Sequence, residues 1–324
     1  VHDATSDVLS LMNVAQADQQ VLMLVLDASA AYWNIPLRQC ERRFYCGKLR
    51  GRKHDRYLCY TRTAQGSRGA PLSWAVVFSL ISRCVLSTLR EPRPLDSTLA
   101  AAMQVFVDDP LSSLRGTPAQ VDRMTAVLIV AWRLLNVGLA FSKGQYGPAV
   151  NWIGAHLTIK PPKEILITIM ESRLDELREM CTEINRHNVI SLKTLRTFTG
   201  KAQSFAGVLY MWRPFVHMFY GALYSDGGDA PPGCTWVRQI SIPLDWILAF
   251  LHGPVHDLER HYSLDAYLRR GDKISITTDA SPYGLGGVLE INGETAAFFA
   301  DKVCKNDRTM LGLGDAPSSR DQQT

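Results

Sequence analysis

The sequence predicts a mixed α/β (α+β) protein, because short apolar strand patterns alternate with longer helical ones. Six consecutive apolar residues, Val21–Leu26, are typical of a strand covered on both faces. Met103–Val107 and Leu111–Leu114 flank an acidic turn, which is the pattern of a β-hairpin. Because the chain has 324 residues, two or three packed units are expected.

The next segments predict a helix and a strand. Thr117 followed by Pro118 and Gln120 forms a capping box with proline at the first helical position, so a helix is expected to begin there. Gly138 is the predicted end of that helix. A short strand is then expected at Trp152–Ile159.

Beyond this strand the pattern becomes helical. Pro161 and Pro162 interrupt the pattern of regular secondary structure and predict a domain boundary. Helices are then expected at Met170–Asn185, after Ser191 as N-cap, and at Leu244–Leu251. After Gly271 strands return: Ile274–Thr278, a tight connection at Gly284–Gly287, then Val288–Ile291 and Thr295–Phe299.

The composition excludes the disordered and fibrous classes of protein. Apolar residues make up 46% and charged residues 20%, which is typical of soluble globular proteins. The formal net charge of +4 permits a polyanionic partner without requiring one. Basic residues concentrate between Arg38 and Arg56, and two interpretations remain open: a solvated hairpin face, or a track for phosphates. The members between those two are Arg42, Arg43, Lys48, Arg50, Arg52 and Lys53.

Cysteine usage and hydropathy predict an intracellular protein, in the cytoplasm or nucleus and not secreted. The seven cysteines lack CxxC spacing and are odd in number, which fits a reducing compartment. No secretory leader opens the sequence. The longest apolar stretch, Leu72–Leu89, contains Arg83 and several serines, so it predicts a buried helix and no membrane partner.

Three carboxylates carry the chemistry. The first strand stops at Asp27, and Asp108 and Asp109 lie in the hairpin turn. Hard oxygen ligands on rigid elements suit two Mg²⁺ ions, with Mn²⁺ as an alternative. Two such ions can clamp the attacking and leaving oxygens of an in-line displacement. Taken alone, the Asp pair could also be an ordinary acidic turn.

The order of the surrounding motifs resembles the reverse transcriptase (RNA-directed DNA polymerase) of a retrotransposon-type polyprotein. Asp27 with Tyr32 resembles motif A, and Phe106 to Asp109 resembles motif C. Motif B is matched by Gln65, Gly66, Gly69, Ala70 and Pro71; motif D by Gly138 and Lys143; and primer-grip motif E by Trp152, Ile153, Gly154 and His156.

This resemblance implies a polymerase palm with partial fingers. Asp27, Asp108 and Asp109 would hold the metal ions, with the Ala28 carbonyl as an added ligand. Lys143 would neutralise or protonate the departing pyrophosphate, or is a surface lysine. The nucleotide would lie against Ala28, Tyr32, Gln65 and Gly66, and the primer against Trp152, Gly154 and His156.

Two of these roles also have a physical argument. The Tyr32 ring, five residues after Asp27, would exclude a 2′-hydroxyl and so favour deoxynucleotides, unless it only packs in the core. Gly66 and Gly69 would let the backbone approach a ligand closely, unless they only form a turn before a helix.

The C-terminal half resembles later parts of the same polyprotein. Leu195–Leu223 resembles a helical connection, which would be either a thumb-like unit or a spacer. Asp279 resembles the first metal ligand of a ribonuclease H domain. No glutamate follows Glu294, so a truncated ribonuclease H-like β-sheet unit without RNA cleavage is expected. The predicted parts are 1–160 (partial fingers and palm), 161–270 (helical connection) and 271–324 (ribonuclease H-like).

The predicted function is template-directed DNA synthesis. Its partners would be an RNA or DNA template with a primer and deoxynucleoside triphosphates, and the oligomeric state is left open. Only 26 residues precede Asp27, and Phe106 and Pro110 depart from the family pattern, so triphosphate binding is the weakest part of the match. The alternatives are a catalytically inactive nucleic-acid-binding remnant and an RNA-dependent RNA polymerase, against which Tyr32 argues.

Overall fold

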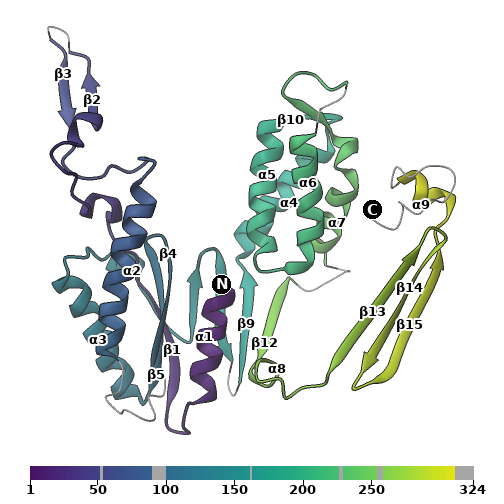
Figure 1. Cartoon of the computed structure of the whole chain (residues 1–324), viewed down its shortest axis with the longest axis horizontal. Helices are drawn as coiled ribbons and strands as arrows, with labels where there is room; N and C mark the ends of the chain where they lie inside the picture. The colour runs from purple at the N-terminus through teal and green to yellow at the C-terminus, as the bar shows by residue number, and fades with distance from the viewer. Residues whose placement is uncertain (52–53, 90–99, 161–162, 226–228, 254–257, 311–324) are drawn as a thin grey trace. The chain divides into compact units, whose positions relative to one another are not determined.

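The computed structural model confirms the mixed α/β fold class and divides the chain into two compact units, Val1–Leu264 and Asp265–Thr324 (Figure 1). It describes residues 1–51, 54–89, 100–160, 163–225, 229–253 and 258–310. Two members of the basic run, Arg52 and Lys53, and the predicted domain boundary at Pro161 and Pro162 lie outside these ranges. The division of the chain into three functional parts stays a prediction.

The first sheet of the larger unit is antiparallel, with strand order β4-β5-β1-β6. Its strands are β1 (Gln20–Val25), β4 (Ala101–Phe106), β5 (Asp109–Gly116) and β6 (Gln145–Gly147). The predicted hairpin is confirmed, since Phe106 pairs with Asp109 and leaves Val107 and Asp108 as its turn. Every residue of β5 from Pro110 to Gly116 is buried, so this strand is covered on both faces.

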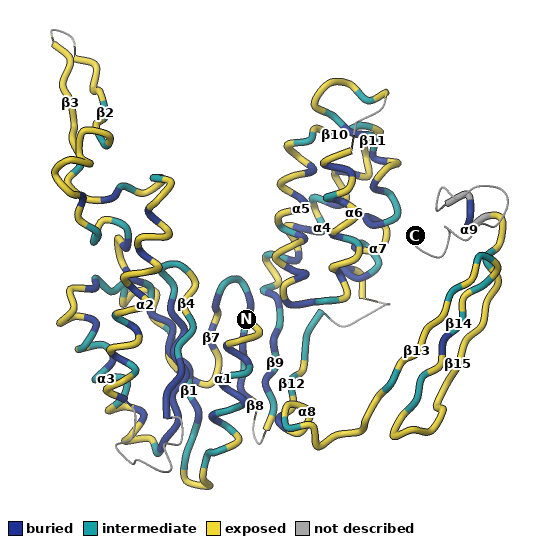
Figure 2. Tube along the Cα trace, viewed as in Figure 1, coloured by how far each residue is buried: buried dark blue, intermediate teal, exposed yellow. Residues whose placement is uncertain are grey.

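Helices α1 (His2–Asn13), α2 (Ala70–Thr88) and α3 (Pro118–Leu134) pack against this sheet. Trp74, Phe78 and Trp132 form an aromatic row in the core between α2 and α3. Figure 2 shows this buried interior as dark blue segments along β1 and its neighbours. The core therefore fixes the strands whose ends carry the three carboxylates.

The start of α3 is confirmed and its predicted end is wrong. Thr117 and Gln120 make both bonds of the capping box. The helix ends before Gly138, because Asn136 takes the left-handed conformation at φ 61°. The amides of Asn136 and Val137 donate to the carbonyls of Arg133 and Trp132, which is a Schellman motif. Asparagine thus fills the position for which glycine was expected.

Helix α2 is buried on one side only, which corrects the expectation of a buried helix. Trp74, Phe78 and Val85 face the core, whereas the side chains at Leu72 and Leu80 are 72% and 63% exposed. Because the helix lies over one layer of the core, nothing among the described residues covers its outer face. In the described part of the chain, α2 alone is long and apolar enough to cross a membrane, a test that core helices of soluble proteins also pass.

A second antiparallel sheet has the order β12-β9-β8-β7. Its strands are β7 (Ala149–Trp152), β8 (Ala155–Lys160), β9 (Glu164–Ile169) and β12 (Glu259–Ser263). The single strand predicted at Trp152–Ile159 is wrong, because Ile153 and Gly154 have φ values of 41° and 81° and turn the chain into a hairpin. Strands β8 and β9 pair across residues 161–162, where the sequence predicted a domain boundary.

A helical layer follows, formed by α4 (Glu171–Asn185), α5 (Leu192–Ala206), α6 (Arg213–Tyr224) and α7 (Ser241–Leu251). The predicted N-cap is confirmed, because Ser191 Oγ accepts a hydrogen bond from the Thr194 amide at 3.0 Å. Phe198 and Phe219 pack edge to face between α5 and α6. The small pair β10 (Val189–Ser191) and β11 (Cys234–Trp236) joins the ends of this layer.

A separate two-stranded hairpin, β2 (Cys46–Leu49) and β3 (Arg56–Cys59), carries part of the basic run. All but one of its strand residues are exposed. The surface location predicted for the basic run is confirmed for these strands. Short 3-10 turns elsewhere join the main elements, at Ala31–Asn34, Arg42–Phe44, Phe141–Lys143, Tyr210–Trp212 and Val237–Gln239.

The smaller unit is a three-stranded antiparallel sheet of β13 (Ile274–Ser281), β14 (Gly284–Ile291) and β15 (Glu294–Lys302). Short helices flank it, α8 (Leu264–Tyr267) at the boundary and α9 (Lys305–Met310) after it. The strands are as predicted, but Gly284–Gly287 lie within β14 and do not form a connection. The Phe299 ring lies so close to Gly287 that a Cβ there would overlap it.

Candidate active site

The three carboxylates come from strands that are neighbours in the first sheet. Val25 of β1 pairs with Leu111 of β5, so the same register continued by two residues places Asp27 opposite Asp109. The Ala28 amide donates to the Asp108 carbonyl at 2.8 Å, which extends this pairing to the turn. The sheet therefore brings Asp27, Asp108 and Asp109 to one end of β1 and β5.

The charges in this cluster act on one another. Burial, and next the negative charges of Asp27 and Asp108, raise the pKa of Asp109 to about 6, while Lys143 opposes the shift. Lys143 Nζ lies 3.3 Å from Asp27 Oδ2, and the two side chains are 73% and 27% exposed. The cluster thus carries more negative charge than its one neighbouring ammonium group balances.

Two indole groups hold the acidic turn. Trp74 Nε1 of α2 donates to the Val107 carbonyl at 2.8 Å, and Trp152 Nε1 of β7 donates to the Asp109 carbonyl at 2.9 Å. Val107 has φ 59°, a conformation that is strained for a β-branched residue. These indole bonds therefore anchor a turn whose own sequence does not favour its geometry.

The loop that carries Lys143 is tied to the backbone around Asp27. The Ala140 amide donates to the Asp27 carbonyl at 3.0 Å, and the Ser29 amide donates to the Gly138 carbonyl at 2.8 Å. A Cβ on Gly138 would lie 3.3 Å from the Ser29 carbonyl oxygen, so glycine permits this close approach. Gly138 and Lys143, predicted together as motif D, are thus brought beside Asp27.

The donor chemistry of the site fits divalent metal ions. Carboxylate oxygens are the ligands that Mg²⁺ and Mn²⁺ prefer. The pKa of Asp109 is raised by burial first and then by the negative charges of Asp27 and Asp108, and a cation would balance those charges. Within the described residues, no three His, Cys, Asp or Glu side chains are already arranged to hold a metal ion. The backbone thus brings the carboxylates together, and metal binding would require their side chains to reorient.

Among the predicted nucleotide-binding residues, Ala28 and Tyr32 follow Asp27 directly in the chain, whereas Gln65 and Gly66 come from the turn before α2. Tyr32 is in the 3-10 turn after Asp27 and packs, half-buried, against the core. Its role at the sugar of the nucleotide stays a prediction. Gln65 and Gly66 are exposed in the turn before α2, and Gly66 needs its glycine because φ is 86°. In the described structure, no hydrogen bond joins Gln65 or Gly66 to the carboxylates.

The predicted primer-grip residues occupy the β7–β8 hairpin. Trp152 is buried and bonds to Asp109, whereas His156 Nδ1 is 2.8 Å from Asn151 Oδ1 on the neighbouring strand. Arg173 of α4 donates to the Gly154 carbonyl at 2.9 Å and to Ser204 Oγ at 2.8 Å. A side chain at Gly154 would collide with Arg173. Arg173 and Trp74 are supporting residues that sequence reasoning missed.

A local signal existed for one of these two residues. Trp74 lies in the helix that follows the predicted motif B, and a tryptophan there suggests an indole N–H that needs a partner. Arg173 is one of many basic residues in the sequence, and its contact with Gly154 depends on how α4 packs.

Asp279 lies in the separate smaller unit. It is exposed on β13 opposite Gly286, and its Oδ1 accepts a hydrogen bond from the Ala280 amide at 2.9 Å. Among the described residues, no further acidic groups join it in a metal-binding cluster. Its assignment as a ribonuclease H-like metal ligand stays a prediction.

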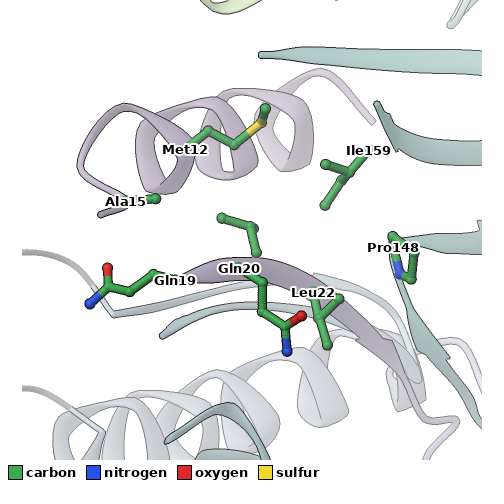
Figure 3. A pocket seen from close by; sticks show the side chains of 8 residues that line it. Met12, Ala15, Gln19, Gln20, Leu22, Pro148 and Ile159 are labelled. Carbon is green, nitrogen blue, oxygen red and sulfur yellow. The ribbon is translucent and has the colours of Figure 1, made fainter. Parts of the chain in front are cut away.

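A pocket of about 420 Å³ lies between α1 and the start of β1 (Figure 3). Met12 and Ile159 lie on facing sides of it, and Gln20 marks the end of β1 that is remote from Asp27. With a rise of about 3.3 Å per residue, the seven steps from Gln20 to Asp27 span roughly 23 Å. This pocket is therefore separate from the carboxylates.

The chain, with an antiparallel sheet that carries carboxylates at one end, a second sheet and a helical layer, is similar in fold to a reverse transcriptase. A solved structure with this fold is a foamy viral protease-reverse transcriptase in complex with an RNA/DNA hybrid. It matches with a TM-score of 0.50 and 13% sequence identity over 92% of this chain. The chain spans 35% of the length of that protein. No family model and no curated protein sequence matches the chain.

Proposed function

We propose that this chain catalyses template-directed DNA synthesis as an RNA-directed DNA polymerase. The observation that carries the proposal is the meeting of Asp27, Asp108 and Asp109 at one end of β1 and β5, with Lys143 beside them. The reverse-transcriptase-like fold supports it. The chain would come from a retrotransposon-type polyprotein and act inside the cell.

The three carboxylates, with the Ala28 carbonyl, would hold two Mg²⁺ ions, which would assist deprotonation of the primer 3′-hydroxyl and stabilise the leaving pyrophosphate. Asp109 must be ionised to bind metal, and with a pKa of about 6 it is ionised at neutral pH. The Lys143 ammonium, exposed and 3.3 Å from Asp27, can turn to the pyrophosphate once metal ions balance the carboxylates.

The other predicted residues would position the substrates. Tyr32, held against the core after Asp27, would exclude the 2′-hydroxyl of a ribonucleotide. Trp152, Gly154 and His156 form a hairpin that is bonded to Asp109, so this hairpin would place the primer end beside the metal ions. The exposed basic residues on β2 and β3 would contact phosphates of the template or triphosphate.

Primer extension on a poly-A template with an oligo-dT primer, deoxythymidine triphosphate and Mg²⁺ tests the proposal. We expect extension by the wild-type chain and none by Asp108→Asn, with a melting temperature equal to or above that of wild type because one repulsive charge is lost. A fully active Asp108→Asn protein would contradict the metal assignment.

The alternatives give different results in the same assay. A folded wild-type chain that binds the primer–template but never extends it is the inactive nucleic-acid-binding remnant. Extension with ribonucleotides at least as fast as with deoxynucleotides would identify an RNA polymerase. If Tyr32→Ala gains no ribonucleotide use, the steric role of Tyr32 is wrong.

A further inference from the structure

The β2–β3 hairpin places two cysteines directly opposite each other. Cys46 begins β2 and Cys59 ends β3, and the strand register pairs them. Their Sγ atoms are 2.6 Å apart, and both cysteines are free and exposed. In the described part of the chain, no other two cysteine sulfurs are in contact. The pair is therefore poised for chemistry that the proposed polymerase does not use.

The backbone geometry at this pair suits a disulfide. The Tyr60 amide donates to the Tyr45 carbonyl at 2.9 Å, so Tyr45 and Tyr60 are a hydrogen-bonded pair. Because such pairs alternate along an antiparallel ladder, Cys46 and Cys59 occupy a non-hydrogen-bonded site, where Cα atoms are about 4.5 Å apart. Disulfides span Cα separations of about 4.4–6.8 Å. A bond between these cysteines therefore needs little backbone movement.

We propose that Cys46 and Cys59 form a redox modification site that closes to a disulfide on reaction with a small-molecule disulfide such as oxidised glutathione. One cysteine thiolate attacks a glutathione sulfur, which forms a mixed disulfide and releases one glutathione thiol. The second cysteine then attacks the protein sulfur of that mixed disulfide and releases the other glutathione thiol. Two protein thiols are oxidised, one oxidised glutathione is reduced, and the two protons leave on glutathione.

The contacts of Cys46 indicate how the reaction depends on pH. Its Sγ lies 3.2 Å from the Arg42 carbonyl and contacts Cys59. The hydrogen bond with Cys59 raises the pKa of Cys46 above its usual value. Because the thiolate is the attacking species, oxidation should become faster as pH rises toward that pKa.

The modification would control the order of the basic hairpin. Two-stranded hairpins are marginally stable on their own, and β2 and β3 form a sheet of two strands. A disulfide at Cys46 and Cys59 closes the base of the segment that carries Lys48 and Arg56. In the disulfide-linked protein, the two strands would stay joined at Cys46 and Cys59 even when their hydrogen bonds break.

Thiol mapping of the full chain tests the site. The protein is treated with oxidised glutathione at pH 8, alkylated under denaturing conditions, digested and examined by mass spectrometry. For wild type we expect a linked peptide pair joining Cys46 to Cys59 without glutathione. Cys46→Ser and Cys59→Ser should each keep a glutathione adduct on the remaining cysteine. Cys40→Ser, which removes an exposed cysteine nearby, should behave as wild type.

Two outcomes would overturn the site: both cysteines remain open to alkylation, or each carries its own glutathione. A second measurement follows tryptic cleavage at Lys48 and Arg56. The linked protein should be cut there at least about threefold more slowly than the reduced protein, because cleavage depends on opening. Equal rates in the linked and reduced proteins would refute the control of hairpin order.

Discussion

Asp27 and Asp279 differ in their surroundings more than in their local sequence. Asp27 follows a strand of the larger unit, and Asp279 lies within a strand of the smaller one. Asp27 follows a buried strand, is tied by its backbone to the Asp108 turn and the Lys143 loop, and faces other charges. Asp279 lies on a sheet that is exposed over most of its length, as Figure 2 shows, and its carboxylate bonds to the next amide. The pKa of a carboxylate on a strand is shifted strongly only where neighbouring elements add charge and exclude water.

The largest expected difference between the two aspartate sites is in catalysis. Loss of a metal-binding carboxylate removes several kcal/mol of charge stabilisation, so Asp109→Asn should lower the extension rate by at least about 1000-fold. Asp279→Asn, an exposed change in the other unit, should alter the rate by less than about twofold. Steady-state primer extension measures both, and a strong loss in Asp279→Asn would show that the smaller unit takes part in synthesis.

The support of the acidic turn predicts an effect on stability that is smaller than the effect on catalysis. Trp74→Phe removes the hydrogen bond to Val107, whereas Trp132→Phe removes a buried indole N–H that has no partner in the described structure. Both residues belong to the same aromatic row. Trp74→Phe should therefore cost roughly 1 kcal/mol more of the free energy of unfolding, measured by urea denaturation. Equal costs would mean that the indole bond does not hold the turn.

A further expected effect, on the same kcal/mol scale as the loss of the indole bond, is a dependence of the free energy of unfolding on pH that comes from Asp109. The pKa of Asp109 in the folded, metal-free protein is about 6, above its usual value, so the folded state binds this proton more tightly than the unfolded state. Stability from this group is complete below pH 4 and is lost as pH rises through about 6, by roughly 1–2 kcal/mol after allowance for solvent screening.

Urea denaturation of the metal-free protein between pH 4 and 8 measures this loss. Asp109→Asn should remove this loss of stability. A wild-type curve with the same pH dependence as that of Asp109→Asn would contradict the raised pKa of Asp109.

The sequence predicted the strands around the carboxylates because their apolar runs, their acidic turn and the Thr117 capping box are local patterns. It failed at Trp152–Ile159, where Ile153 adopts a positive φ that its side chain disfavours, and at Gly138, whose expected role Asn136 fills. These conformations are imposed by packing and by bonds from distant segments.

In the candidate site, too, the sequence predicted the residues of local motifs but not the contacts between distant segments. Asp27, Asp108, Asp109 and Lys143 could be named from motif order, and the structure places them together. Their support could not be predicted, because Trp74 and Arg173 act through contacts with residues 33 and 19 positions away. Such contacts depend on how the helices pack against the sheets.

The second sheet determines where this chain can be shortened. Strand β9 pairs with β8 across residues 161–162, and β12, which follows the helical layer in the sequence, pairs with β9. A shortened chain that ends at residue 160 would expose the full hydrogen-bonding edge of β8, and such edges recruit other strands and promote aggregation. Recombinant fragments should therefore end after Leu264, where both four-stranded sheets of the larger unit are complete.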